Sequence, residues 1–209
     1  MNRFVSAFAA CGAALVAIAP AVLETSPPHP GVSLTATALI MGGTGQVFSV
    51  GPSTPEFLAE FTTATYEDLI APTGLCVGGD PGCALVAVYA PNQLRPLTGF
   101  ADLTFDDSVA EGRANLDDCV RGKACIATPP PYSSTGVQPL TDTSYVVTGL
   151  SQSAVIASTE KSNLIAQPVA DATISFVLIA NPNRPNGGLL ERFVGAYIPI
   201  FGMSFNGAT

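Results

Sequence analysis

The sequence has 209 residues, with 8 Lys and Arg, 16 Asp and Glu, one His and no Trp. Charged residues make up 11% and hydrophobic residues 47%, which excludes a disordered chain and indicates one domain with a real core. The net charge of −8 excludes a nucleic-acid partner, because few cations are present to neutralise phosphates. The single histidine also argues against histidine-rich metal chemistry, and we expect neither a metal nor a cofactor.

Residues 1–21 have the layout of a secretory signal peptide, with one early positive charge, an apolar segment and a possible cleavage site at Ala19-Pro20-Ala21. The same segment is long enough for an uncleaved membrane anchor, and Cys11 also permits a lipobox. Residues 22–32 form a proline-rich linker that contains His29, which we expect to be solvated. These features predict a secreted or envelope-associated protein whose domain covers residues 33–209.

Four cysteines remain after the signal segment, and an even number in an exported chain indicates disulfides. Four cysteines allow three pairings, of which the local ones, Cys76–Cys83 and Cys119–Cys125, close short loops. Zinc is the alternative, but the spacings differ from the usual two intervening residues, and no histidine is near. We therefore expect these two local disulfides.

Apolar and β-branched runs predict four buried strands, and the segments between them contain helix signals. Thr54-Pro55-Glu56 is typical of a helix start, and its expected apolar stripe comprises Phe57, Leu58, Phe61 and Ala64. Ser108 and Glu111 resemble a capping box for a second helix, whose expected apolar face is Val109, Leu116 and Val120. A third helix should follow Gly149 and end near Ala166. The expected strands are residues 33–41, 84–90, 144–148 and 173–180, and residues 127–140 are expected to be a proline-rich loop.

Strands that alternate with helices indicate an α/β fold, in which a mainly parallel sheet is covered by helices on both faces. The segment between the third strand and the third helix reads Gly149-Leu150-Ser151-Gln152-Ser153. A nucleophilic serine in an α/β hydrolase occupies such a strand-to-helix turn, with small residues two positions before and after it. Ser153 replaces the usual glycine but is still short. Ser151 is therefore a candidate nucleophile, and the backbone N–H of Gln152 is a candidate oxyanion donor.

A glycine-rich segment, Gly42-Gly43-Thr44-Gly45, follows the first expected strand directly. In α/β hydrolases the second oxyanion donor comes from a loop after an earlier strand, so Gly43 and Thr44 are candidates for this role. A plain turn and a phosphate-binding loop are the alternatives. The phosphate loop is disfavoured because no Gly-Lys-Ser/Thr sequence completes it.

Several blocks of this sequence, in the same order, resemble the PE-PPE domain, and the resemblance covers about Thr35 to Thr209. The run Asn181-Pro182-Asn183-Arg184-Pro185-Asn186-Gly187-Gly188 is far more specific than the serine motif. The other blocks are Ala36 to Gly45, Phe105 to Gly112, Gly149 to Ala154, Phe176 to Ala180, Leu190 to Phe193, and Tyr197 to Thr209.

The resemblance implies an α/β-hydrolase fold and a serine esterase, lipase or acyltransferase of lipid-rich cell envelopes. Fatty-acyl esters or acylated glycolipids would be its substrates, an acyl-enzyme would form on Ser151, and Gln152 with the Gly43–Thr44 loop would form the oxyanion hole. The family's acid and histidine lie beyond the block that ends here at Thr209, and Asp171 precedes its strand at the wrong end for a triad acid. We therefore expect the nucleophile half of a hydrolase, with an inactive, lipid-binding or vestigial envelope protein as the alternative.

Overall fold

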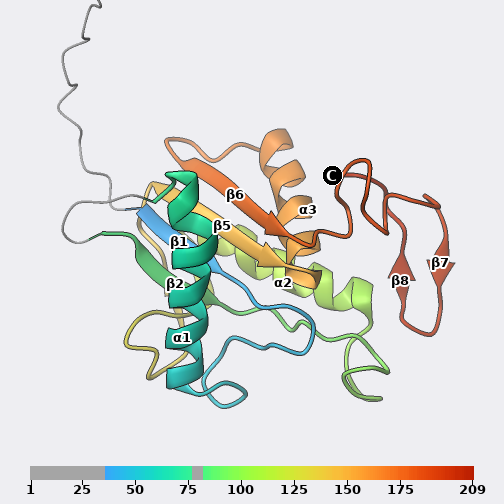
Figure 1. Ribbon diagram of the computed structural model, residues 1–209, viewed down its shortest axis with the longest axis horizontal. Helices are drawn as coiled ribbons and strands as arrows, with labels where there is room; N and C mark the ends of the chain where they lie inside the picture. Colours follow the sequence, from blue (N-terminus) through green and yellow to red (C-terminus); the bar gives the residue numbers. More distant parts are fainter. Residues whose placement is uncertain (1–35, 77–81) are drawn as a thin grey trace, which may run out of the picture. The chain divides into compact units, whose positions relative to one another are not determined.

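The computed structural model describes residues 36–76 and 82–209, and the expected signal segment, the linker and His29 lie outside them. The chain forms a six-stranded sheet in the order β4-β3-β2-β1-β5-β6, with three α-helices packed against it (Figure 1). The strands are β1 (Ala36–Ile40), β2 (Ala84–Val88), β3 (Ala124–Thr128), β4 (Gly136–Pro139), β5 (Ser144–Leu150) and β6 (Thr173–Ile179). The helices are α1 (Pro55–Thr65), α2 (Phe105–Val120) and α3 (Gln152–Ala166), and a small hairpin comprises β7 (Tyr197–Ile198) and β8 (Met203–Ser204).

The sheet is mainly parallel, as the sequence predicts, because β1 pairs in parallel with β2 and β5, and β5 with β6. The prediction of a loop over residues 127–140 is wrong in part: residues 129–135 lie outside the strands, but β3 extends to Thr128 and β4 covers Gly136–Pro139. These two strands extend the sheet with two antiparallel pairings. These strands have five and four residues, too few for a clear alternating pattern. Pro139 is accepted because β4 is the edge strand, where a missing N–H leaves no partner unpaired.

Helices cover both faces of the sheet, as predicted. Leu39 and Met41 pack with α2 and α3, whereas Ala38 and Ile40 pack on the other face with Leu58 of α1. Successive strand residues point to opposite faces, so the uninterrupted apolar run in β1 supplies both cores. Figure 1 shows α1 in front of the sheet, with α2 and α3 behind it.

The start of α1 agrees with the sequence prediction, whereas the start of α2 differs from it. Thr54 caps α1, where its hydroxyl accepts a hydrogen bond from the Phe57 N–H (3.2 Å). The Ser108 capping box is wrong, because Thr104 caps α2 one turn earlier and Ser108 is fully buried inside the helix. The predicted stripe of α1 is correct only in part. Its buried residues are Leu58, Thr62 and Thr65, while Phe57 and Ala64 are exposed.

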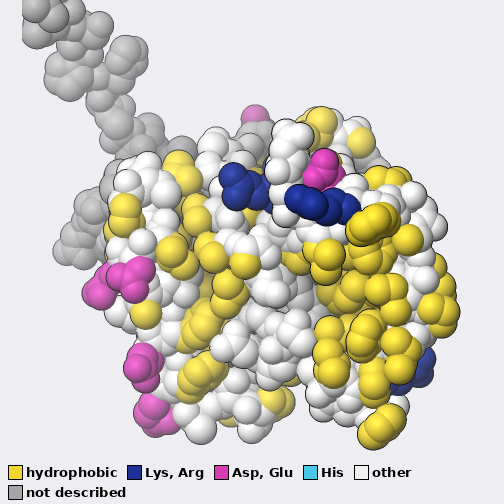
Figure 2. All heavy atoms as spheres, turned by 45° about the vertical axis from the view of Figure 1, so that its right-hand side comes forward, with side chains coloured by type: hydrophobic (Ala, Val, Ile, Leu, Met, Phe, Trp, Pro, Cys, Tyr) yellow, Lys and Arg dark blue, Asp and Glu magenta, His cyan; other side chains and the backbone are white. Residues whose placement is uncertain are grey.

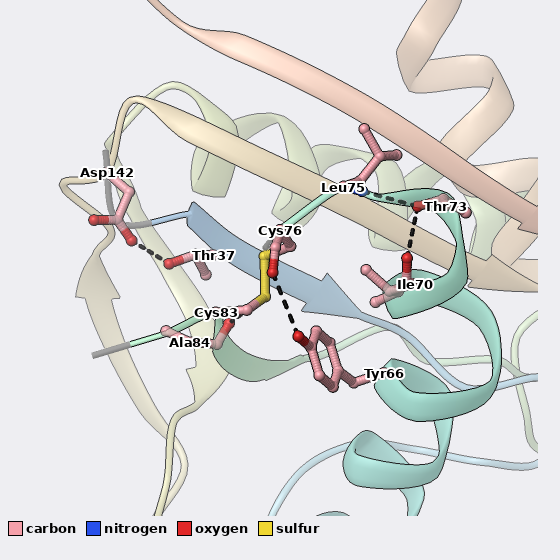
Figure 3. Close-up of a disulfide and its surroundings, with 9 residues drawn as sticks. All are labelled: Thr37, Tyr66, Ile70, Thr73, Leu75, Cys76, Cys83, Ala84 and Asp142. Carbon is pink, nitrogen blue, oxygen red and sulfur yellow. Dashed lines mark hydrogen bonds between the residues drawn. A yellow bond between two sulfur atoms is a disulfide. The ribbon is translucent and has the colours of Figure 1, made fainter. Parts of the chain in front are cut away.

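Both predicted disulfides are present. Cys76 and Cys83 join the end of the α1 region to the start of β2, with 5.2 Å between their Cα atoms (Figure 3). Cys119 and Cys125 join the end of α2 to β3 with a Cα separation of 5.1 Å. The two bonds therefore fasten helices to neighbouring strands on opposite faces of the sheet. Within residues 36–76 and 82–209, none of the helices is both long and apolar enough to cross a bilayer.

Candidate active site

Ser151 occupies the sharp turn between β5 and α3, where its backbone adopts φ 55° and ψ −110°. A positive φ is costly for a residue with a side chain, so the surrounding structure must hold this turn in place. The Ser151 N–H donates to the carbonyl of Ile179 at the end of β6 (2.9 Å), and the Ser151 carbonyl accepts from Ala154 (3.0 Å). The turn is therefore fixed by both the neighbouring strand and the helix that follows.

The residues two positions to either side explain why the motif needs short side chains. A Cβ on Gly149 would lie 2.5 Å from the Ser153 carbonyl oxygen, which is closer than real contacts allow. Ser153 is fully buried, and its hydroxyl accepts a hydrogen bond from the Leu150 N–H (2.8 Å). Serine therefore fits where glycine is usual, because its hydroxyl bonds to the backbone of the turn.

Gln152 begins α3 and points its side chain into the protein interior, where it is 1% exposed. Its amide nitrogen donates to the Gln93 carbonyl (2.8 Å) and to the Ser108 hydroxyl (3.1 Å). Its amide oxygen accepts from the Thr44 hydroxyl (3.0 Å). The Gln152 side chain thus bonds to the glycine-rich loop, to the segment after β2 and to α2, and it holds these three segments beside the candidate nucleophile.

The two candidate loop donors are in different situations. The Gly43 N–H donates to the side-chain oxygen of Gln46 (2.8 Å), so an oxyanion would have to displace that side chain. Thr44 lines the same cavity as Ser151 and Gln152. The Gln152 N–H lies in the first turn of α3, where backbone donors have no acceptor within the helix. Thr44 and Gln152 are therefore better placed than Gly43 to bind a negative oxygen at Ser151.

The cavity at Ser151 has a volume of about 140 Å³ and a mostly apolar wall. A larger cavity of about 600 Å³ adjoins it and shares Pro182 and Leu189 with it. The smaller cavity is lined by Thr44, Leu94, Phe105, Ser151, Gln152, Pro182, Leu189, Leu190 and Met203. Such a wall suits an apolar group close to a reactive hydroxyl.

No residue of this lining, within the described part of the chain, has an imidazole or a carboxylate. Asp171 lies exposed just before β6, at the end of the parallel strands opposite to Ser151, which agrees with a surface charge. His29 lies outside the described residues. The structure therefore places the nucleophile and oxyanion candidates together, and residues 36–76 and 82–209 supply no base to the cavity lining.

A buried ionic cluster lies behind the turn, between α2 and α3. The Glu160 side chain is fully buried and pairs with Arg113 (3.2 Å), and it accepts a hydrogen bond from Asn163 (3.1 Å). The pKa of Glu160 is raised to about 7, chiefly by burial and also by nearby Asp117, while the hydrogen bonds from Asn163 and Arg113 act in the opposite direction. The helix that carries the candidate nucleophile therefore holds a carboxyl group that titrates near neutral pH.

Sequence reasoning missed several residues that shape this site. Gln46, Gln93 and Ser108 hold the glycine-rich loop and Gln152, and the turn at residues 182–190 forms one cavity wall. These residues are far from the serine motif in sequence, and each has an ordinary local context. The one signal in the chain was the Asn-Pro-Asn-Arg-Pro-Asn-Gly-Gly run, which lies in that wall.

Comparison of the sequence with known proteins identifies its family. Residues 81–209 match the PE-PPE domain. Esterase PE16 of Mycobacterium tuberculosis is 36% identical over 177 residues, covering 83% of this chain and 28% of the relative. The PE family protein PE3 of the same organism is 36% identical over 177 residues, covering 83% and 31%. The uncharacterised PPE family protein PPE42 of this species is 35% identical over 196 residues, covering 91% and 28%. The chain thus spans less than a third of the length of these relatives.

Proposed function

The chain belongs to the PE-PPE domain family, and we propose that it is a serine esterase or acyltransferase acting on fatty-acyl esters through Ser151. The observation that carries this proposal is the Ser151 turn, whose positive φ is held by β6 and α3 beside an apolar cavity. The similarity to a protein named an esterase supports the same chemistry. Fatty-acyl esters or acylated glycolipids are the proposed substrates, and the apolar cavity wall supports the acyl part of either.

In the proposed reaction the Ser151 oxygen attacks the acyl carbonyl carbon while a base removes the hydroxyl proton. The carbonyl oxygen becomes negative and accepts hydrogen bonds from the N–H groups of Gln152 and Thr44. Collapse of this intermediate breaks the ester bond, and the departing alcohol takes the proton. Water or a sugar hydroxyl then attacks the acyl-enzyme, which gives either hydrolysis or acyl transfer. The base must come from outside the described lining of the cavity.

A fluorophosphonate probe tests the nucleophile directly, because it reacts only with an activated serine. We expect the wild type to be labelled, Ser151→Ala to lose all labelling, and Ser134→Ala, at an exposed serine far from the turn, to keep it. A wild-type protein that is folded but not labelled would refute the proposal.

The cavity lining also favours a second candidate, a scaffold that binds acyl lipids without turning them over. Its supporting observation is that the described residues around Ser151 offer no base. This candidate predicts that a fluorescent fatty-acyl ester binds equally to the wild type and to Ser151→Ala, with no product from either. Release of the alcohol by the wild type alone would exclude it.

We also propose that the protein is exported to the cell envelope or beyond. The signal-like sequence of residues 1–21 supports this, as do two disulfides of a kind that persists in oxidising compartments. Cell fractionation of the tagged protein tests the proposal, and full retention in the reducing cytosol would refute it.

A further inference from the structure

Exposed hydrophobic side chains are concentrated around the Ser151 cavity. Among the described residues, seven of the twelve large exposed hydrophobic side chains fall in two segments, residues 94–103 and 189–203, which we call the docking face. They are Leu97 (71% exposed), Phe100 (88%), Leu189 (60%), Phe193 (75%), Val194 (68%), Tyr197 (57%) and Ile200 (62%). Hydrophobic side chains gather on the side of Figure 2 that corresponds to β7 and β8 in Figure 1. Clusters of this kind on a protein surface mark interaction sites.

The helix start that directly follows the first segment is bonded to the second segment. The Phe105 N–H donates to the Phe201 carbonyl (2.9 Å) and the Asp106 N–H to the Gly202 carbonyl (3.0 Å), which joins the start of α2 to the β7–β8 turn. The Asp106 carboxylate also accepts a hydrogen bond from the Ser204 hydroxyl (2.6 Å). The β7–β8 turn, which carries Ile200, is therefore fixed to the residues that directly follow the first segment.

The docking face borders the candidate active site. Its first segment contributes Leu94 to the cavity wall, and its second contributes Leu189, Leu190 and Met203. Leu189 is 60% exposed and lines both the small cavity and its larger neighbour. A lipid resting on this face could therefore reach the cavity along apolar surface.

Charge distinguishes this face from the rest of the molecule. Four basic residues have no ion pair within the described part of the chain, and all lie in or beside the docking face or the adjoining cavity: Arg95, Lys161, Arg184 and Arg192. Acidic side chains are exposed along α1 and the turn after it, and most acidic side chains in Figure 2 lie at the edge opposite the hydrophobic surface. Two acidic residues, Asp102 and Glu191, also lie in these segments, so the docking face and the adjoining cavity together hold four basic and two acidic residues in a chain whose net charge is −8.

We propose that the docking face binds the surface of an anionic lipid layer and so presents the Ser151 cavity to acyl lipids within it. Apolar side chains beside these four cations match acyl chains below negative headgroups. A second copy of the chain fits less well, because a symmetric contact would bring together two surfaces with the same net positive charge. The proposal deepens the proposed function, since it concerns how the substrate reaches Ser151.

Vesicle flotation tests this proposal with the full chain carrying Ser151→Ala, so that binding is measured without turnover. We expect stronger binding to vesicles of equal phosphatidylglycerol and phosphatidylcholine than to pure phosphatidylcholine, and weaker binding at high salt. Phe100→Ser with Ile200→Ser should reduce the partition coefficient about tenfold or more. The matched control is Val137→Ser with Ile165→Ser, two residues 69% and 73% exposed outside the docking face, which should bind normally.

Three results would overturn the proposal: no flotation of the protein, equal loss of binding in both double variants, or a vesicle-free dimer that only Phe100→Ser with Ile200→Ser dissociates. The last result would show that a second copy covers this face. Probe labelling of the wild type separates the two proposals. Flotation without labelling would support lipid docking and refute the proposed hydrolase. Labelling without flotation would support the hydrolase and refute lipid docking.

Discussion

The two walls of the Ser151 cavity are built in different ways. On one side, the turn from β5 to α3 is densely packed, and Gln152 and Ser153 are 1% and 0% exposed. On the other side, residues 181–209 form turns and the two-residue strands of a hairpin, with Phe193 75% exposed. Few side chains anchor this second wall to the body, notably Leu190 and Phe205, which pack against Phe105 and Val155.

This contrast separates two tasks in one site. The proposed nucleophile needs a fixed and strained backbone, which only a tightly packed strand and helix can hold. The opposite wall is the one proposed to meet the lipid, and exposed apolar turns there cost the fold little. The following substitutions test whether stability resides mainly in the first wall.

The largest effect is expected from Gly149→Ala, because its Cβ would lie 2.5 Å from the Ser153 carbonyl oxygen. We expect the free energy of unfolding to fall by about 3 kcal/mol, measured by urea denaturation with the disulfides intact. Gly187→Ala in the other wall is the matched control, because nothing lies within 4 Å of the position that its methyl group would take. Equal losses in the two variants would contradict the contrast.

Gln152→Leu should have the next largest effect, since it leaves the Thr44, Gln93 and Ser108 groups without their buried partner. We expect a loss of about 2–3 kcal/mol in unfolding free energy. In an active preparation kcat should fall more than KM rises, because Thr44 is displaced. Gln167→Leu, at an exposed glutamine after α3, should change neither quantity.

Glu160 gives a pH-dependent test of the same wall. Because burial raises its folded-state pKa from 4.5 to about 7, the folded protein binds this proton more tightly than the unfolded chain. Stability should therefore fall as pH rises from about 4.5 through about 7. Burial acts on Asp117 in the same direction, but the hydrogen bond from Arg121 and the nearby positive charges outweigh it and lower the pKa of Asp117. Its contribution therefore changes only at lower pH.

Thermal unfolding between about pH 5 and pH 8 measures this effect. Glu160→Gln should flatten the decline, because glutamine does not titrate and its one amide oxygen can still accept a hydrogen bond. A variant that shows the same slope as the wild type would assign the pH dependence to other groups.

The smallest effect is expected at Ser151 itself. Ser151→Gly should be about 1 kcal/mol more stable than Ser151→Ala, because only glycine accepts φ 55° without strain. Both variants lack the hydroxyl, so differential unfolding isolates the backbone contribution. If alanine is as stable as glycine, the turn is not strained and the first wall owes its geometry to packing alone.

Much of the fold could be predicted from residues close together in sequence. The Thr54 cap, the parallel strands, the Ser151 turn and the two disulfides all have local signals. The failures have a common physical cause. Ser108 has the pattern of a cap but is used to bind Gln152, which lies 44 residues away in the sequence. β3 and β4 form because the edge of β2 is open to pairing, which no pattern within residues 124–139 indicates.

The sequence by itself determined the nucleophile turn, because the small residues at 149 and 153 reflect steric limits within five consecutive positions. Only the tertiary structure decided what surrounds that turn. The Thr44–Gln152 hydrogen bond joins residues 108 positions apart, and the docking face joins the start of α2 to a hairpin near residue 200. Contacts of this kind depend on how the sheet orders its strands, so they leave no local pattern in the chain.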